Sequence, residues 1–398
     1  MAQTRRRDRR RPRCHPAGAA CSRSPRGDYS PPPVVVGPRV QRFRASRPWP
    51  SVPVMRHRVG VAALGVVLGS MMLGACGATT PAASSTSPLA AHWAPFRHVP
   101  GVVDLAGPRA DGSFVVAAAG NLSVLAAGGT LGPFARGPNG YATARGPEPY
   151  IALGEDAAVA GTECSFSRDT LYALEPGKRP GVILVDAQGR ARRVADLPAG
   201  LLPDGIAFDG VGRFGHRLLV TVLGSKATTV VALDCNGATR TVAARAPVAE
   251  GGVVVAPASF GRFGGDLIVP DEHTGRVIAI DPRGRAITVV RSSLPSGSDI
   301  GVESAGFVPP GFGRGGAAYL ADRFSKGNPH PGTNSILRLA GPELARAGVR
   351  PGDLLVASEG GAKTIAVRCG QRCTVTHIAN GPAVAHAEGH IVFALALR

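Results

Sequence analysis

Two common catalytic signatures are missing from this sequence. It contains no G-x-S-x-G nucleophile elbow and no H-E-x-x-H helix motif, which excludes the serine hydrolases and zinc peptidases that are built on them. It also has no C-x-x-C pair accompanied by a second cysteine or histidine pair, which excludes the common structural zinc sites. Any chemistry of this chain must therefore come from other residues.

Acidic residues are scarce beside basic ones, with 27 Asp and Glu against 45 Lys and Arg and a formal net charge of +18. The excess lies near the start, because residues 1–54 hold 13 Arg and two Asp, and residues 56 and 58 are also Arg. From residue 59 onward the net charge is only +5. A nucleic-acid-binding face needs clustered basic residues, so we predict that the chain does not bind nucleic acid.

The sequence also lacks an uninterrupted apolar run of the roughly 20 residues that a transmembrane helix needs. A shorter apolar stretch, residues 59–72, follows the basic segment Met55-Arg-His-Arg58 and precedes Leu73-Gly-Ala-Cys76. A basic segment, a short apolar segment and small residues in this order are typical of a secretory signal. Together with the cysteine, this order resembles the signal and lipobox of bacterial lipoproteins.

The resemblance implies that Cys76 becomes the lipidated N-terminus of an exported protein, anchored to the cell membrane on its extracytoplasmic side. Since a signal peptide starts a chain, we expect synthesis to begin at Met55 and residues 1–54 to be a disordered basic leader. The expected organisation is a leader (1–54), a signal peptide (55–75), a flexible tether of small residues (76–93) and one folded domain (94–398).

The cysteines agree with export to an oxidising compartment. Beyond Cys76 there are four of them, an even number, at positions 164, 235, 369 and 373. Cys369 and Cys373 flank a three-residue turn between two strand-like segments, so we expect their sulfur atoms to meet across a hairpin. Cys164 and Cys235 then remain as the second predicted pair, by elimination.

Nearly all of the sequence after residue 94 has the pattern of short β-strands. Apolar runs such as 181–185, 218–222 and 277–280 alternate with Gly, Pro and Asp, and only residues 342–347 favour a helix. The motif Gly-Arg-Phe-Gly occurs at 212–215 and again at 261–264, with a degenerate copy at 313–316. A period of about 50 residues with several strands per repeat is typical of propeller blades. We therefore predict an all-β fold, a β-propeller with six four-stranded blades.

Acidic residues open the predicted innermost strands of these blades. They are Asp204, Glu250 and Glu303, with Asp104, Glu148 and Glu388 as further equivalents. The long interval between Glu303 and Glu388 requires an insertion in this scheme. We expect residues 390–397 to close the ring by joining a sheet with residues 101–105, because closure removes exposed strand edges.

Segments such as Phe263–Asp281 resemble the blades of NHL-type propellers and of the wider superfamily of gluconolactonases and strictosidine synthase-like proteins. The resemblance covers roughly residues 94–398 and implies the propeller fold, whereas blade patterns are shared by many functions. Gluconolactonase-like enzymes hold Ca²⁺ with a carboxylate, an Asn and an Asp, so the resemblance also implies Ca²⁺ as the candidate cofactor. The matching Asn has no secure equivalent here.

In a four-stranded blade, the start of the innermost strand and the turn between the second and third strands lie on the same face. Converging carboxylates there suit Ca²⁺, which takes six to eight oxygen ligands, and we predict Glu250, Glu303 and Asp204 as metal ligands. The predicted ligand-binding residues on this face are Asp271, His273, Asp322, Arg323 and Asn334. The alternative is that these acids only begin strands and satisfy turn backbones.

The loop at residues 322–334 is unusually long and carries two prolines around His330. Such a stiffened loop could cover the channel, and His330 is the predicted general acid or base, the alternative being an exposed histidine without a role. Two functions stay open. One is a membrane-anchored propeller that binds a small ligand, a glycan or a partner protein at its channel face. The other is a Ca²⁺-dependent hydrolase of lactones or esters.

Overall fold

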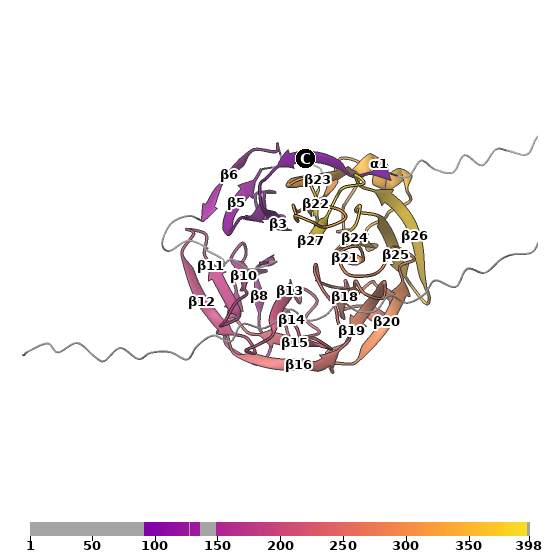
Figure 1. Ribbon diagram of the computed structural model, residues 1–398. Coiled ribbons are helices and arrows are strands. Elements are labelled where there is room, and N and C mark those ends of the chain that lie inside the picture. Colours follow the sequence, from indigo (N-terminus) through magenta and orange to yellow (C-terminus); the bar gives the residue numbers. More distant parts are fainter. Residues whose placement is uncertain (1–90, 127, 136–148, 396–398) are drawn as a thin grey trace, which may run out of the picture. The chain divides into compact units, whose positions relative to one another are not determined.

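The computed structural model describes residues 91–126, 128–135 and 149–395, which form a ring of small antiparallel β-sheets (Figure 1). Four blades consist of strands that follow one another in the chain. Blade 1 holds β3 (Val102–Ala106), β4 (Phe114–Ala118), β5 (Asn121–Leu125) and β6 (Leu131–Ala135); blade 2 holds β7 (Ile151–Leu153), β10 (Leu171–Glu175), β11 (Gly181–Val185) and β12 (Ala191–Asp196); blade 3 holds β13 (Leu202–Phe208), β14 (Leu218–Leu223), β15 (Thr228–Leu233) and β16 (Thr239–Ala246); blade 4 holds β17 (Val254–Val255), β18 (Leu267–Asp271), β19 (Arg276–Ile280) and β20 (Ala286–Arg291).

The last two blades are interlocked, because each takes strands from separate parts of the chain. Blade 5 holds β21 (Val302–Phe307), β24 (Leu354–Ser358), β25 (Thr364–Cys369) and β26 (Cys373–Asn380), and β1 (Ala91–His92) lies parallel to β26; blade 6 holds β27 (Ala387–Ala394), β22 (Ala317–Asp322), β23 (Ser335–Ala340) and β2 (Ala94–His98). One parallel pair, Ala305 with His390, links the two blades. The described residues therefore contain six blades, and the predicted propeller is confirmed.

The interval between Glu303 and Glu388 has a different explanation from the expected insertion. After β21, the first strand of blade 5, the chain crosses to blade 6 and forms its two middle strands, β22 and β23. It then returns through the short helix α1 (Gly341–Arg346) and adds β24, β25 and β26 to blade 5. The expected helix at 342–347 corresponds to α1.

The prediction that residues 390–397 close the ring by pairing with residues 101–105 is wrong. In the described residues, β27 pairs with β22 and with one residue of β21, and it packs against β3 without forming a ladder with it. The ring is closed by the N-terminal strands, since β2 pairs with β23 and β1 pairs with β26. Strand pairing also begins at Ala91, three residues before the predicted domain boundary at 94.

The inner strands are short continuous apolar runs because each blade is covered on both faces by its neighbours. Every position of β3, β18 and β24 is buried, whereas the outer strands β12 and β16 expose several side chains. The Gly-Arg-Phe-Gly copies lie in the connections that leave β13 and β17. Their Phe214 and Phe263 are only 1% and 2% exposed, so the motif repeats because each copy inserts a phenylalanine into the core.

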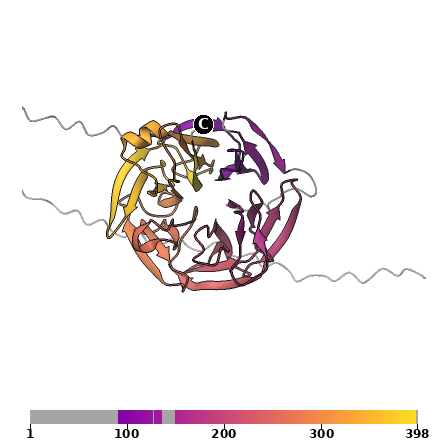
Figure 2. The same cartoon turned by 180° about the vertical axis from the view of Figure 1, so that it is seen from behind.

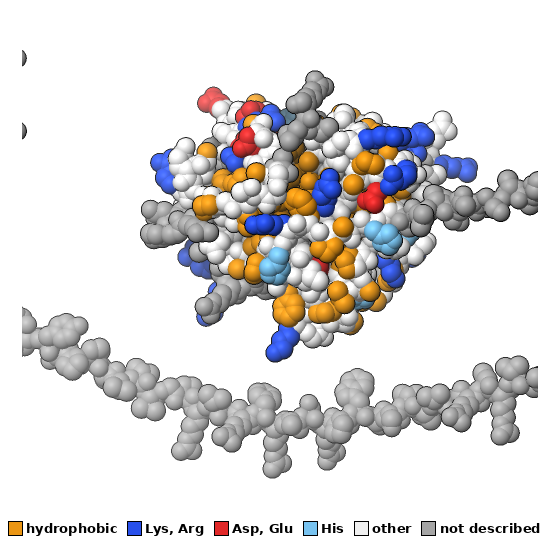
Figure 3. Space-filling model, turned by 90° about the horizontal axis from the view of Figure 1, so that it is seen from above, with side chains coloured by type: hydrophobic (Ala, Val, Ile, Leu, Met, Phe, Trp, Pro, Cys, Tyr) orange, Lys and Arg blue, Asp and Glu red, His pale blue; other side chains and the backbone are white. Residues whose placement is uncertain are grey.

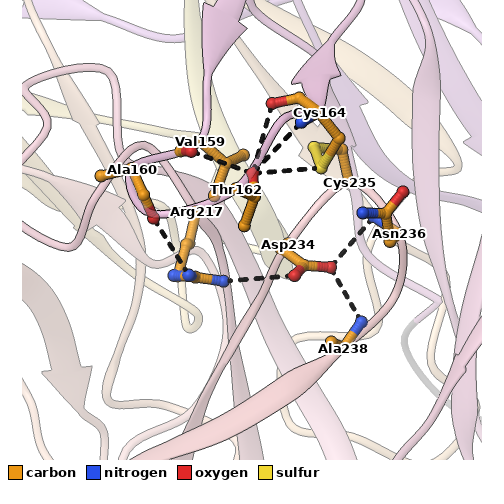
Figure 4. The surroundings of a disulfide bond; sticks show 9 residues. All are labelled: Val159, Ala160, Thr162, Cys164, Arg217, Asp234, Cys235, Asn236 and Ala238. Carbon is orange, nitrogen blue, oxygen red and sulfur yellow. Dashed lines mark hydrogen bonds and ion pairs between the residues drawn. A yellow bond between two sulfur atoms is a disulfide. The ribbon is translucent and has the colours of Figure 1, made fainter.

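Both predicted disulfides are present. Cys369 and Cys373 are joined across the turn between β25 and β26. Cys164 lies beside the extra hairpin of blade 2, formed by β8 (Ala157–Ala158) and β9 (Ser165–Phe166), and it is bonded to Cys235 in the β15–β16 turn of blade 3 (Figure 4). Beside this bond, Arg217 donates to the carbonyl oxygen of Ala160 and lies 3.7 Å from Asp234. The disulfide therefore joins two neighbouring blades.

Several sequence predictions concern residues outside the described part. These are the leader, the signal segment, Cys76 and most of the tether, together with Glu148. Among the described residues, no helix has the length and hydropathy needed to cross a bilayer. On the side of the ring seen in Figure 3, Lys and Arg side chains are separated by apolar and uncharged ones.

Candidate functional site

Backbone bulges place two of the predicted acids at equivalent positions. In blade 3 the pairing of β13 with β14 skips Asp204, and in blade 5 the pairing of β21 with β24 skips Glu303. A bulge redirects the side chain of the extra residue and is common beside functional sites. The expectation that acids open the inner strands at corresponding positions is therefore met by these two residues.

A cavity of about 160 Å³ lies where the inner strands β21 and β27 begin. Its lining is almost entirely polar: Glu250, Glu272, His273, Ser298, Asp299, Glu303, Glu359 and Glu388. We call it the acidic cavity. It contains two of the three predicted metal ligands, Glu250 and Glu303, and the predicted ligand-binding residue His273. Asp204 is 1% exposed and is not part of this lining.

Glu250 and Glu272 form a carboxyl pair in this cavity. Burial raises the pKa of Glu250 to about 7, and the neighbouring Glu272 carboxyl adds to the effect. Burial likewise raises the pKa of Glu272 to about 7. Two ionised carboxylates so close together repel each other, so the pair retains a proton near neutral pH. The Oε1 atom of Glu272 is buried without a hydrogen-bond partner among the described residues, although such atoms normally have one.

On the opposite side of the cavity, the carboxylates of Glu359 and Glu388 are paired with cationic side chains of the protein. His386 Nε2 lies 2.9 Å from Glu359 Oε1 and 3.2 Å from Glu388 Oε1. Burial alone would lower the pKa of His386, but the two carboxylates outweigh it and raise that pKa to about 10. Arg323 donates to Glu388 at 2.8 Å, and the Tyr150 hydroxyl donates to it at 2.7 Å. His386 is therefore an imidazolium at neutral pH.

Two groups of ligand atoms could hold a metal ion, each with its atoms within 4.8 Å of one another: Glu250, Glu272 and His273, and Glu359, His386 and Glu388. A protonated histidine has no lone pair for a metal, so the second group is a poor cation site. The first group keeps a repulsive carboxyl pair and an unpartnered buried oxygen. The residues present therefore fit a hard divalent cation at Glu250 and Glu272, with Glu303 and Glu359 nearby.

Three of the predicted ligand-binding residues form hydrogen bonds within the protein. Asp271 accepts hydrogen bonds from the side chains of Thr274 and Arg276 within its own hairpin turn. Asp322 binds Thr333 and accepts a hydrogen bond from the backbone of His386.

Asn334 has φ +55° and accepts a hydrogen bond from the backbone nitrogen of Gly101. It thereby ties the β22–β23 turn to the start of blade 1. Like Asp271 and Asp322, it is not part of the cavity lining. Arg323 acts through Glu388, as described above.

His330 lies at the edge of the same face. Its Nδ1 is 2.7 Å from the carbonyl oxygen of Ala383. A carbonyl oxygen only accepts, so Nδ1 is the donor in this contact. A side chain at Gly360 would come within 3.0 Å of Cδ2 and Nε2 of His330, so the ring lies against the residue that follows Glu359. A base role for His330 stays a prediction.

Beneath the acidic cavity, an ion pair fills the centre of the ring. His390 Nδ1 lies 3.0 Å from Asp104, and its Nε2 lies 3.0 Å from the carbonyl oxygen of Ile206 and 3.1 Å from that of Val253. Asp104 also accepts from the backbone nitrogens of Ile151 and His390. These contacts join blades 1, 2, 3 and 6 and the segment before β17. The predicted acid Asp104 is therefore part of a structural bridge.

Sequence reasoning missed Tyr150 and His386. His386 carried a usable signal, since residues two apart in a strand face the same side and it stands two positions before Glu388. Tyr150 stands just before β7 and carried no local signal, because its two acidic neighbours in space belong to β21 and β27.

No protein-family model matches this chain, and no curated protein matches it. Solved structures with a similar fold include virginiamycin B lyase from Staphylococcus aureus, with a TM-score of 0.39 and 11% identity over 72% of this chain and 88% of that one. They also include a calcium-binding protein, regucalcin, from Agrobacterium tumefaciens, with a TM-score of 0.34 and 13% identity over 60% and 74%. A gluconolactonase from Xanthomonas campestris has a TM-score of 0.31 and 15% identity over 62% and 87%. The function of this chain has to be derived from its own residues.

Proposed function

We propose that the protein is a hydrolase of small lactones or esters that uses a divalent cation, Ca²⁺, in the acidic cavity. The observation that carries the proposal is the Glu250–Glu272 pair, in which both pKa values are raised to about 7 and one buried oxygen lacks a partner. Strongly shifted carboxyls in a cavity indicate a functional site. A bound cation would relieve the repulsion of the pair and use the unpartnered oxygen.

The size of the cavity limits what enters it. At about 160 Å³ it is smaller than the roughly 300–1,000 Å³ of sites that enclose a whole drug-sized ligand. The reacting carbonyl group would enter, while the rest of the substrate would lie outside over the loop at 322–334. The chemistry supplied by a bound Ca²⁺ is Lewis acidity toward a carbonyl oxygen.

Residues of the chain would transfer the proton and hold the acidic side chains in position. In hydrolysis the water oxygen bonds to the carbonyl carbon, the acyl carbon–oxygen bond breaks, and a proton passes from the water to the leaving oxygen. His273, whose side chain is 50% exposed and whose Nδ1 lies 3.6 Å from Glu272, is placed to move this proton. The His386 imidazolium, Arg323 and Tyr150 hold Glu388 and Glu359 in position.

Cation binding is tested by calorimetry on the purified protein. Since the carboxyl pair holds a proton near neutral pH, binding of Ca²⁺ should release it, and the heat should depend on the ionisation enthalpy of the buffer. Glu272→Gln should weaken binding at least about tenfold. Glu163→Gln, a matched change on an exposed loop, should have no effect. Wild-type protein that binds no Ca²⁺, or binds it equally after Glu272→Gln, would contradict the site.

Activity is tested with a panel of γ- and δ-lactones and p-nitrophenyl esters. We expect hydrolysis that requires Ca²⁺ and falls about 10²- to 10⁴-fold in His273→Gln while Ca²⁺ binding is retained. The parallel variant His330→Gln decides which histidine moves the proton. A protein that binds Ca²⁺ but hydrolyses nothing would leave a binding function.

That second candidate is a propeller that binds a small ligand, a glycan or a partner protein at the same face. The observation in its favour is Phe324, which is 51% exposed in the loop that carries Arg323 and His330. An exposed aromatic ring beside a polar cavity suits contact with a sugar or a protein surface. Phe324→Ala should weaken such binding and leave Ca²⁺ binding unchanged.

The same proposal places the protein outside the cytoplasm, anchored by a lipid on Cys76. Support comes from the signal-like segment at residues 55–75 and from the two disulfides of the propeller. Mass spectrometry of the N-terminal peptide from native cells tests it. An unmodified Cys76, or peptides from residues 1–54, would contradict the anchor.

A further inference from the structure

A second and larger cavity opens where the inner strands end, at the other end of the channel from the acidic cavity. Its volume is about 630 Å³, within the range of sites that enclose a small organic molecule. Somewhat more than half of its wall is apolar, and the apolar side chains come from inner strands, including Leu105, Ile151, Ile206, Val253, Ile391 and Phe393. Figures 1 and 2 view the ring from its two faces.

The floor of this apolar cavity is formed in part by His390. The histidine is 9% exposed, and its ring is fixed by Asp104 on one side and by two backbone carbonyls on the other. Its charge is therefore balanced within the protein. The floor is rigid, separates this cavity from the acidic one, and offers a ligand no free charge.

The rim carries more carboxylates than cations. Glu155 and Asp156 follow β7, and they line the cavity together with Arg168 and Asp169. Asp156 and Asp169 already accept hydrogen bonds from backbone nitrogens. Among the described residues, no Lys, Arg or His nitrogen lies within 4.0 Å of the Glu155 carboxylate.

Glu155 is an exposed residue of blade 2 whose carboxylate reaches toward blade 3. A side chain at Gly210 would come within 2.6 Å of its Oε2, so the carboxylate lies against the backbone at the junction of blades 2 and 3. Partial loss of water and the nearby Asp209 raise the pKa of Glu155, whereas His216 and Arg168 act in the opposite direction and do not fully offset them. A positive group from outside the chain would offset both effects.

We propose that this cavity binds a small molecule with an apolar body and one ammonium group, the body lying against the inner strands and the ammonium beside Glu155. The site is independent of the acidic cavity and of the hydrolysis proposed for it. Contact between apolar surfaces supplies most of the affinity, and the carboxylate selects the charge of the head group.

Three probes with the same body test the charge preference: 4-phenylbutylamine, 4-phenylbutan-1-ol and 4-phenylbutyrate, each titrated into the full chain by calorimetry at low salt. The amine should bind at least about tenfold more tightly than the carboxylate, with the alcohol between them. Glu155→Gln should bring the amine to the level of the alcohol. Glu155→Arg should reverse the order of amine and carboxylate.

A substitution that fills the cavity tests whether the apolar part of the probes lies there. Val255, half-buried in the wall, can be changed to Trp, which should abolish binding of all three probes. If that variant fails to fold, the two Glu155 variants decide, because their side chains lie on the rim. Failure of all three probes to bind, equal affinity for them, or tighter binding of the carboxylate through Arg168 would overturn the proposal. Amine binding that Glu155→Arg leaves unchanged would place the amine in the acidic cavity and would also overturn it.

Discussion

Charged residues in this protein act in two different ways, and the charge of the nearest partner decides which. Asp104 and His390 are buried and satisfy each other, and both also bind backbone groups of other blades. Glu250 and Glu272 instead lie together as two like groups, and they share a proton near neutral pH. A paired buried charge fixes a structure, whereas a repelling pair is ready to bind an ion or a proton. The protein thus has a satisfied ion pair at its centre and an acidic cavity above it.

His390→Gln should destabilise the fold by about 3–5 kcal/mol, because it leaves the buried Asp104 charge uncompensated. Burial lowers the pKa of His390, but Asp104 outweighs this and raises the pKa above its ordinary value of 6.5. The charged form is thus favoured by folding. Its stabilisation is complete below about pH 6 and is lost as the pH rises through the folded-state pKa.

Thermal unfolding across the pH range measures both effects. The Tm difference between wild type and His390→Gln should be largest near pH 6 and should shrink as the pH rises. His98→Gln, on the exposed strand β2, is the matched control and should follow wild type. Parallel curves for wild type and His390→Gln would show that the histidine is not charged in the fold.

Among the elements, the two N-terminal strands are responsible for closing the ring. Trp93 stands between β1 and β2, is 2% exposed, and donates a hydrogen bond of 2.8 Å to Thr364 of blade 5. It belongs to an apolar cluster with residues of both blades, such as Leu355 of blade 5 and Leu337 of blade 6. It therefore packs into both interlocked blades.

Trp93→Ala should cost about 3–5 kcal/mol, the usual loss for a buried tryptophan. Arg97→Ala, an exposed neighbour on β2, should change stability by less than about 0.5 kcal/mol. Urea unfolding of both variants provides the comparison. A Trp93→Ala protein as stable as Arg97→Ala would mean that the N-terminal strands contribute little to closure.

The same elements show what sequence could and could not predict. Six blades, the short helix at 341–346 and the Cys369–Cys373 hairpin follow from local patterns of apolar runs and turn residues. The placement of β22 and β23 in blade 6 does not follow from local sequence patterns, because a strand has the same pattern of residues whichever sheet it joins. In the site, Glu250 and Glu303 were predictable from their place before or within inner strands. Tyr150 and the pairing of His386 with two acids depend on blades far apart in sequence.

At the scale of the whole propeller, the two disulfides close loops of very different length. Cys164 and Cys235 are 71 residues apart and join blades 2 and 3, whereas Cys369 and Cys373 are 4 residues apart within one hairpin. In the chain-entropy account, the longer loop stabilises by about 4 kcal/mol and the shorter by about 2 kcal/mol. The neighbouring blades around the longer loop are also held by Arg217 and Asp234.

We therefore expect Cys164→Ser with Cys235→Ser to lower the free energy of unfolding by about 2 kcal/mol more than Cys369→Ser with Cys373→Ser. Urea unfolding of the two double variants, each compared with oxidised wild type, measures the difference. A third variant carries all four substitutions and so lacks both bonds. Wild type with both disulfides reduced should have the same stability as this variant, and a difference would show that serine itself disturbs one of the sites. A larger loss from the short hairpin would mean that its bond acts through packing of blade 5 rather than through chain entropy, and that the contacts between blades 2 and 3 are sufficient without a covalent link.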